Sequence, residues 1–211
     1  WHMFDSRHVV TTAEELRELV PPPRSAQQTK VLSSLDEHCC RWIQRSPFVV
    51  VCSTDSSGNM DLSPKGDPAG FVQILDDKTL AIPDRPGNRR LDTLHNVMEQ
   101  PHVGLMFMVP GRGEVLRVGG IAQIVNDPDL LASMAVADRP PILALVVEAK
   151  EVMFHCGKSV IRSKLWSPSE WPRIDDLASY AECLGDQTTS DETVAQMEAR
   201  FGSWHEGNEL Y

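Results

Sequence analysis

The sequence lacks most features that mark well-known functional classes. Its longest apolar runs, Phe48–Cys52 and Ile142–Val147, are too short to cross a bilayer. Its five cysteines have no CxxC spacing, and the motifs of serine hydrolases, zinc proteases, P-loop proteins and dinucleotide-binding folds are missing. We therefore expect no membrane association, no metal site, and free thiols in a cytoplasmic protein. The sequence identifies no catalytic residue.

An excess of positive charge is also lacking. The chain carries a formal charge of −10, and no basic stripe interleaved with aromatic residues occurs in it. Nucleic acids and anionic lipids attract basic surfaces, so neither is an expected partner. No signal peptide is recognised, and we expect the natural start at Met3.

Short apolar segments separated by tight turns fill the middle of the chain, and one helix, expected over Asn88–Gln100, interrupts them. The predicted strands are Phe48–Cys52, a return strand from Met60, Phe71–Leu75, Thr79–Ile82, His102–Val109, Glu114–Val125 and Ile142–Phe154. This pattern indicates a mainly β fold with flanking helices (α+β). The strand pattern by itself favours a closed antiparallel barrel.

The two ends of the chain are predicted to be helical. Thr12 and Glu15 form a capping-box pattern for a helix that ends at Val20. Apolar residues at helical spacing then predict one helix over Ser25–Gln44, and two short helices follow over 177–184 and 190–201, the second capped by Ser190. We divide the chain into a helical extension (1–45), the barrel (46–166) and a C-terminal loop with short helices (167–211), all in one structural domain.

Three arginines lie within six residues where a predicted strand turns into a helix. The segment Asp84-Arg85-Pro86-Gly87-Asn88-Arg89-Arg90 combines guanidinium groups, a proline-glycine turn and a helix start, with Asn88 as the expected N-cap. Such a combination favours a bound phosphate. The alternative is a solvated basic turn whose arginines pair with Asp84 or Asp92.

Three further segments are candidate binding elements. Prolines and glycines restrict the loop around Lys65 and Asp67, which is either a binding loop or an ordinary turn. Gly119 and Gly120 follow Arg117 inside a strand and mark a bulge or a close approach of a ligand or backbone. Trp166, beside Lys164, either stacks on a flat ring or packs against the barrel.

Four of these blocks, taken in order, resemble the pyridoxamine 5′-phosphate oxidase-like superfamily of FMN-binding split barrels, within an uncharacterised bacterial subgroup. The resemblance covers residues 48–166. It rests on Ser63-Pro64-Lys65-Gly66-Asp67, the turn from Pro83 to Arg90, Pro101-His102-Val103-Gly104-Leu105-Met106-Phe107 and Leu116-Arg117-Val118-Gly119-Gly120. It implies an antiparallel split β-barrel of Greek-key type.

The resemblance also implies a function. Proteins of this superfamily form homodimers with FMN in the grooves between the barrels, so we expect an FMN-dependent oxidoreductase with a small-molecule substrate and an electron donor or acceptor. The cofactor-binding residues that it implies are Lys65, Pro83, Asp84, Arg85, Asn88, Arg89, Arg90, Arg117, Lys164 and Trp166. Arg117 and the 164–166 segment are expected to approach from the partner subunit or to close the site.

The chain departs from true pyridoxamine phosphate oxidases at its C-terminus. Those enzymes carry an arginine-rich tail that recognises the substrate phosphate, whereas this chain has an acidic tail over Trp204–Tyr211. Vitamin B6 oxidation is therefore not expected. The superfamily also contains proteins that bind deazaflavin F420 or haem, for which His95, His102 and His155 are the candidate ligands. A flavin, F420 or haem carrier or sensor without turnover stays open as the alternative, and so does a purely structural interaction module.

Overall fold

The computed structural model describes residues 5–205, 207 and 210. Met3, the expected natural start, lies outside them, as do four residues of the acidic tail. The chain divides into two compact units, Trp1–Val31 and Leu32–Tyr211. The division falls after Val31, whereas the sequence places the end of the helical extension at residue 45.

The N-terminal unit contains a short 3₁₀ helix, η1 (Ser6–His8), and the helices α1 (Ala13–Leu19) and α2 (Ser25–Thr29). The predicted capping box is confirmed, because the backbone N–H of Glu15 donates to Thr12 Oγ1 while the Glu15 carboxylate accepts from the Thr12 N–H. Neither α1 nor α2 buries a residue. Local capping rather than packing therefore defines where α1 begins.

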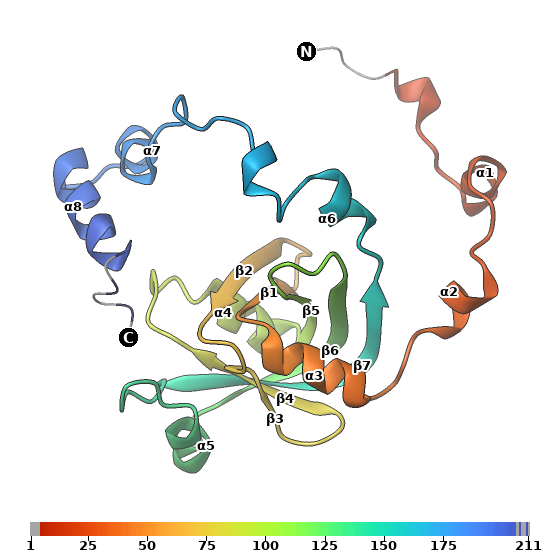
Figure 1. The fold of residues 1–211 in the computed structure, drawn as a ribbon, viewed down its shortest axis with the longest axis horizontal. Coiled ribbons are helices and arrows are strands. Elements are labelled where there is room, and N and C mark those ends of the chain that lie inside the picture. The colour runs from red at the N-terminus through yellow and green to blue at the C-terminus, as the bar shows by residue number, and fades with distance from the viewer. Residues whose placement is uncertain (1–4, 206, 208–209, 211) are drawn as a thin grey trace. The chain divides into compact units, whose positions relative to one another are not determined.

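One antiparallel sheet forms the body of the second unit (Figure 1). Its strands are β1 (Phe48–Thr54), β2 (Met60–Gly66), β3 (Gln73–Ile74), β4 (Thr79–Asp84), β5 (His102–Met108), β6 (Val115–Val125) and β7 (Leu143–His155). They are arranged in the order β2-β1-β5-β6-β7-β4-β3. Because β4 lies beside β7, at the far side of the β5–β6–β7 meander, the connection is of Greek-key type. The predicted mainly β fold with flanking helices is confirmed.

The barrel is split and not closed. Within the described residues β2 pairs with β1 on one edge only, and the end of β4 pairs with β7 only. The closed barrel indicated by the strand pattern alone is therefore wrong, and the split barrel is confirmed. Pro64 on β2 and Pro83 on β4 lack an N–H donor, and proline is found mainly in edge strands for this reason.

A β-bulge lies opposite the paired glycines of β6: Gly119 pairs with Glu151 and Gly120 with Ala149, so Lys150 on β7 is the extra residue. The register between β6 and β7 shifts between Gly119 and Gly120. A Cβ atom at Gly120 would lie 2.4 Å from the backbone oxygen of Glu148. Close approach of the neighbouring backbone, and not of a ligand, therefore explains this glycine.

Helix α3 (Glu37–Arg45) packs Cys39 and Ile43 into the main core, together with Leu35 just before it. The single helix predicted over Ser25–Gln44 is wrong, because residues 30–36 between α2 and α3 form an isolated β-bridge and bends in place of helical turns. Leu32 exchanges two backbone hydrogen bonds of 2.9 Å with Val152 on β7. Asp36 then caps α3 by accepting from the Cys39 N–H at 2.8 Å.

Helix α4 (Asp92–Glu99) begins later than predicted and packs against β1, β2 and β6. Thr93, Leu94 and Val97 are buried under the sheet. Asn88, Arg89 and Arg90 therefore lie in the loop before the helix and not in its first turn. A short helix that the sequence analysis missed, α5 (Pro128–Ser133), joins β6 to β7 and is capped by Asp127.

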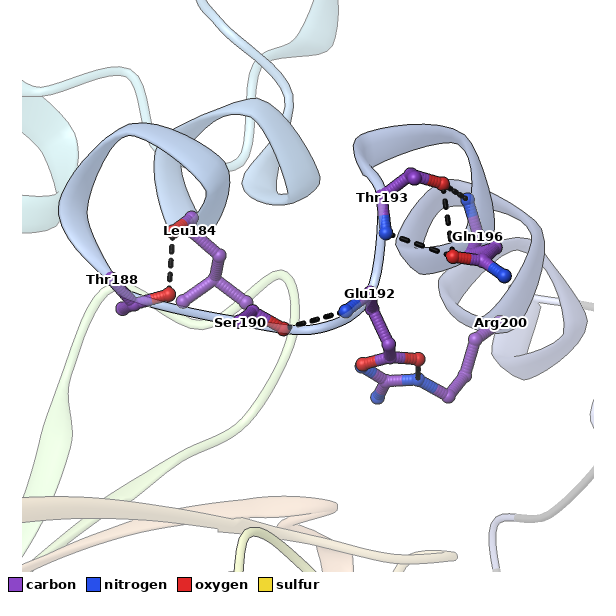
Figure 2. Close-up of polar contacts among 7 residues, drawn as sticks. All are labelled: Leu184, Thr188, Ser190, Glu192, Thr193, Gln196 and Arg200. Atoms are coloured by element: carbon purple, nitrogen blue, oxygen red, sulfur yellow. Dashed lines mark hydrogen bonds and ion pairs between the residues drawn. The ribbon is translucent and has the colours of Figure 1, made fainter.

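The chain after the sheet forms α6 (Lys158–Arg162), η2 (Pro168–Glu170), α7 (Tyr180–Gln187) and α8 (Val194–His205). The sequence predicts the last two helices a few residues too early. Figure 2 shows that Thr193, and not Ser190, caps α8: the Gln196 N–H donates to Thr193 Oγ1 while Gln196 Oε1 accepts from the Thr193 N–H. No helix among residues 5–205 is long and apolar enough to span a membrane.

Candidate functional site

A cavity of about 410 Å³ lies at the split in the barrel. Its walls come from β2 (61–65), the end of β4 with the loop after it (84–89), and the N-cap and first turn of α4 (91–94), with Ile142 before β7. We call it the seam cavity. It shares Lys65, Arg85 and Asn88 with a neighbouring cavity of about 650 Å³ that extends to Pro83.

An ion pair joins the two sides of the split. Lys65 Nζ on β2 lies 3.1 Å from Asp84 Oδ1 at the end of β4, and both side chains are about one quarter exposed. Backbone pairing between these strands is missing from the described residues, so side chains make the connection. The split is therefore polar, and Lys65 and Asp84 can exchange their contact with each other for contacts to a ligand.

Arg85 links separate segments of the chain through hydrogen bonds inside the protein, and we call its contact with Asp67 the Arg85–Asp67 clamp. Its Nε donates to Asp67 Oδ2 at 2.6 Å, and its Nη2 donates to the backbone oxygen of Met134 at 2.7 Å. The Asp67 side chain is fully buried and that of Arg85 is 14% exposed. Arg85 lines the seam cavity, but its donors hold the loop after β4 to the segment after β2 and to the segment after α5.

Arg89 and Arg90 differ in their surroundings although they are adjacent. Arg89 lines the seam cavity and makes no side-chain hydrogen bond or ion pair with the described residues. Arg90 points to solvent and donates to Asp92 Oδ2 at 2.6 Å. This hydrogen bond raises the pKa of Arg90 above its ordinary value. The basic-turn alternative is therefore correct for Arg90 alone.

The backbone before α4 is held in an unusual conformation. Arg89 and Leu91 have φ angles of 60° and 61°, in the left-handed region that L side chains rarely occupy. Asn88 does not cap the helix; its Oδ1 accepts from the Arg90 N–H at 3.0 Å. Strained residues of this kind cluster at binding sites, where the surrounding structure holds them in place.

The N-terminus of α4 opens onto the seam cavity without a side-chain cap. Leu91 occupies the N-cap position and cannot accept a hydrogen bond from the first turn. Backbone N–H groups at such a helix end bind anions, helped by the helix dipole. The nearby Thr93 hydroxyl donates to Asp61 Oδ2 at 2.7 Å, so the Asp61 carboxylate already has a partner.

The structure does not bring all predicted residues together. Lys65, Asp84, Arg85, Asn88 and Arg89 line the seam cavity, and Pro83 lines its neighbour. Arg90 lies outside. Arg117 lines a groove on the outer face of the sheet, Lys164 pairs with Glu170, and Trp166 Nε1 donates to the Arg112 oxygen at 2.8 Å.

Several cavity residues were missed by the sequence analysis. Asp61 and Thr93 come from two elements that the sequence does not show to be neighbours, and Ile142 is predicted only as the first residue of an apolar strand. The left-handed Leu91 has no sequence signal, because leucine is a common helix interior residue. Ser63 and Pro64 belong to the segment around Lys65 that the sequence offers as a binding loop, and Pro86 and Gly87 belong to the arginine-rich turn.

The candidate haem ligands lie elsewhere. His95, His102 and His155 are on α4, β5 and β7, and none of them lines the seam cavity. Within the described part of the chain no group of three or more metal-ligating side chains occurs.

Comparison with known families gives a clear match. The family model described as pyridoxamine 5′-phosphate oxidase matches residues 35–156, which include the whole sheet and the α3 and α4 helices. No curated protein matches the sequence.

Three solved structures illustrate the fold similarity. A putative pyridoxamine 5′-phosphate oxidase from Lactobacillus delbrueckii is 18% identical, with a TM-score of 0.46, over 58% of this chain and 95% of that chain. An FMN-binding protein from Syntrophomonas wolfei is 10% identical, with a TM-score of 0.42, over 55% of this chain and 80% of that chain. HutZ, the haem storage protein from Vibrio cholerae, is 12% identical, with a TM-score of 0.42, over 58% of this chain and 94% of that chain.

Proposed function

The chain belongs to the pyridoxamine 5′-phosphate oxidase-like family, and from that premise we propose that its seam cavity binds FMN in a homodimeric oxidoreductase that acts on a small molecule. The observation that carries the proposal is the pairing of two anion-binding features in one cavity. Arg89 faces the cavity without an ionic partner in the described structure, and the α4 N-terminus beside it has no side-chain cap.

The residues present fit a phosphate. A phosphate at the α4 N-terminus would accept hydrogen bonds from the first-turn N–H groups and from the Arg89 guanidinium. The phosphate would also supply a negative charge to balance the Arg89 guanidinium and the positive end of the α4 helix dipole. The three carboxylates of the cavity do not prevent this, because Asp61, Asp84 and Asp92 are engaged by Thr93, Lys65 and Arg90.

The rest of the cavity fits a polar, flat group. Its volume of about 410 Å³ lies within the usual range of small-molecule sites. The facing edges of β2 and of the end of β4 have no strand partner in the described residues, so their backbone groups can hydrogen-bond a ligand. Lys65 and Asp84 add a donor and an acceptor at the same place.

The bound flavin would supply hydride or electron transfer, and the protein residues would position it. Arg89 and the α4 N-terminus would fix the phosphate, and the Arg85–Asp67 clamp would hold the loop that carries Arg89. The Lys65–Asp84 pair would orient the polar edge of the cofactor. In this division of roles Arg85 is a positioning residue, because its donors are used within the protein.

A second copy of the chain fits the outer face of the sheet. A groove of about 330 Å³ is lined by Val50, Cys52, Leu62, Met106 and Met153 from four strands, with Arg117 and Glu151 at the same surface. Leu62 is 67% and Met106 37% exposed. Exposed apolar patches of this kind mark interaction surfaces. In such a dimer Arg117 would lie at the interface. This position agrees with the expectation, drawn from the family resemblance, that Arg117 approaches the cofactor from the partner subunit.

A non-catalytic carrier or sensor is the second candidate. It is favoured by the engagement of all three cavity carboxylates, which leaves no acidic side chain there ready for proton transfer. Reduction of the bound cofactor by NADH or NADPH, followed by reoxidation with an added acceptor, separates the two. A redox cycle supports the enzyme, and a cofactor that stays oxidised supports the carrier.

The cofactor itself is tested by the visible absorption spectrum of the purified protein and by the mass of the compound that heat releases. Flavin bands with the mass of FMN are expected. A Soret band would identify haem as the cofactor in place of FMN, and the mass of F420 would identify F420. A colourless protein that also fails to bind added FMN would contradict the proposal.

A further inference from the structure

A second cavity lies apart from the seam cavity, between α3, the β5–β6 hairpin and β7. It has a volume of about 740 Å³ and shares no lining residue with the seam cavity. We call it the hairpin pocket. The family match and the proposed function assign no role to it.

The walls of the hairpin pocket are rich in positive charge. His38, Arg41 and Arg45 recur along α3 at spacings of three and four, which places them on one face of the helix. Arg112 lines the pocket from the hairpin. Three guanidinium groups thus surround a pocket lined by one carboxylate, that of Glu114, in a chain whose formal charge is −10.

Ion pairing accounts for only part of this charge. Arg41 pairs with Glu37 along the helix, and Arg112 lies 3.4 Å from Glu114. Arg45 has no hydrogen bond or ion pair to any side chain in the described part of the protein. Its place in the last turn of α3 favours a cation, because the helix dipole is negative there. The dipole does not explain why Arg112 is brought to the same pocket.

The floor of the hairpin pocket is aromatic. The rings of Trp42 and Phe154 meet edge to face with centroids 5.3 Å apart. The Arg112 guanidinium lies 5.7 Å from the centroid of the Trp42 ring, within the range of a cation–π contact. Trp42 Nε1 is buried and has no hydrogen-bond partner in the described structure. A buried donor without an acceptor is unfavourable.

We propose that the hairpin pocket binds a nucleotide, with its planar base on the Trp42 and Phe154 surface and its phosphates at Arg45 and Arg112. Guanidinium groups bind phosphate oxygens through charge-assisted hydrogen bonds. The aromatic floor adds an affinity for a flat ring that a bare phosphate would not use. The volume lies within the range of small-ligand sites.

The test is a calorimetric titration of the full-length protein with ADP, adenosine and inorganic pyrophosphate, at constant ionic strength. ADP is expected to bind once per chain and more tightly than either fragment. The double variant Arg45→Ala/Arg112→Ala should weaken ADP binding by about tenfold or more, because each arginine contributes a charge-assisted hydrogen bond. Arg173→Ala, which changes an exposed arginine of the C-terminal loop, is the matched control and should leave the affinity unchanged.

The Arg89→Ala variant separates this inference from the proposed function. It alters the seam cavity only, so it should leave ADP binding intact even if FMN binding is lost. ADP binding that is abolished by Arg89→Ala and retained in the double variant would place the nucleotide in the seam cavity and overturn the inference. Absence of ADP binding, or pyrophosphate binding as tight as ADP binding, would also overturn it. An unchanged thermal unfolding midpoint confirms that the double variant is folded.

Discussion

The three arginines after β4 have three different environments, although the sequence presents them as one cluster. Arg85 is tied to a buried carboxylate, Arg89 faces the seam cavity, and Arg90 pairs with Asp92 in solvent. The sequence analysis identified the segment correctly but could not separate its members. The side-chain directions depend on the left-handed backbone at Arg89 and Leu91, which no local pattern announces.

Removing the Arg85 clamp is predicted to destabilise the protein. Arg85→Met would leave the fully buried Asp67 carboxylate without its guanidinium partner, at a cost of about 3 kcal/mol in the free energy of unfolding. Urea denaturation measures this change. Arg90→Ala is the control and should leave the free energy of unfolding nearly unchanged, since its ion pair is exposed to solvent. Equal effects of the two variants would contradict the assignment of Arg85 as a structural clamp.

Thiol reactivity provides a second test at the residue scale. Burial raises the pKa of the Cys39 thiol to about 12, whereas Cys156 is exposed. Because the thiolate is the reactive form, Cys39 should remain unlabelled by a thiol reagent at pH 8 in the native protein, and Cys156 should react rapidly. Peptide mass mapping before and after denaturation distinguishes them. Rapid native labelling of Cys39 would show that α3 does not pack as described.

At the scale of elements, the strands were more predictable than the helices. Strand positions follow from apolar runs between Gly, Asn and Asp turns, and each predicted strand is present within a few residues. The helix expected over 25–44 was wrong because Leu32 pairs with β7, a contact made across 120 residues of sequence. The late start of α4 and the split in the barrel also depend on such long-range contacts.

The cap of α3 gives a pH-dependent prediction. The Cys39 backbone N–H lowers the pKa of Asp36, so the folded state favours the carboxylate. Its contribution is present above the ordinary pKa of aspartate and is lost as the pH falls through the lower pKa of the folded protein. Asp36→Ala should cost about 1 kcal/mol at pH 7.

The matched variant for this cap is Asp36→Asn. Asparagine keeps the capping oxygen but does not titrate, so stability at pH 7 should be nearly retained while the acid dependence from this residue disappears. Thermal unfolding between pH 3 and pH 7 gives both quantities. A flat difference between Asp36→Asn and the native protein over that range would contradict the titration of Asp36.

At the scale of the whole molecule, the outer face of the sheet is the surface on which the proposed dimer depends. Met106→Glu places a charge in the centre of the apolar groove and should convert a dimer into a monomer. Analytical ultracentrifugation measures the mass. Ile174→Glu, which changes an equally apolar and more exposed residue outside the groove, should leave the dimer intact. A dimeric Met106→Glu variant would show that the second copy binds elsewhere.

The most direct test of the central claim is a fluorescence titration of the cofactor-free protein with FMN, comparing the native chain with Arg89→Ala and Arg90→Ala. The structure predicts that Arg89→Ala weakens FMN binding by about tenfold or more, because Arg89 is the cavity arginine with no competing partner in the described residues. Arg90→Ala should change the affinity by less than about twofold, since Arg90 is an exposed, paired side chain. Equal FMN affinity in the native protein and Arg89→Ala would contradict the assignment of the seam cavity as the flavin phosphate site.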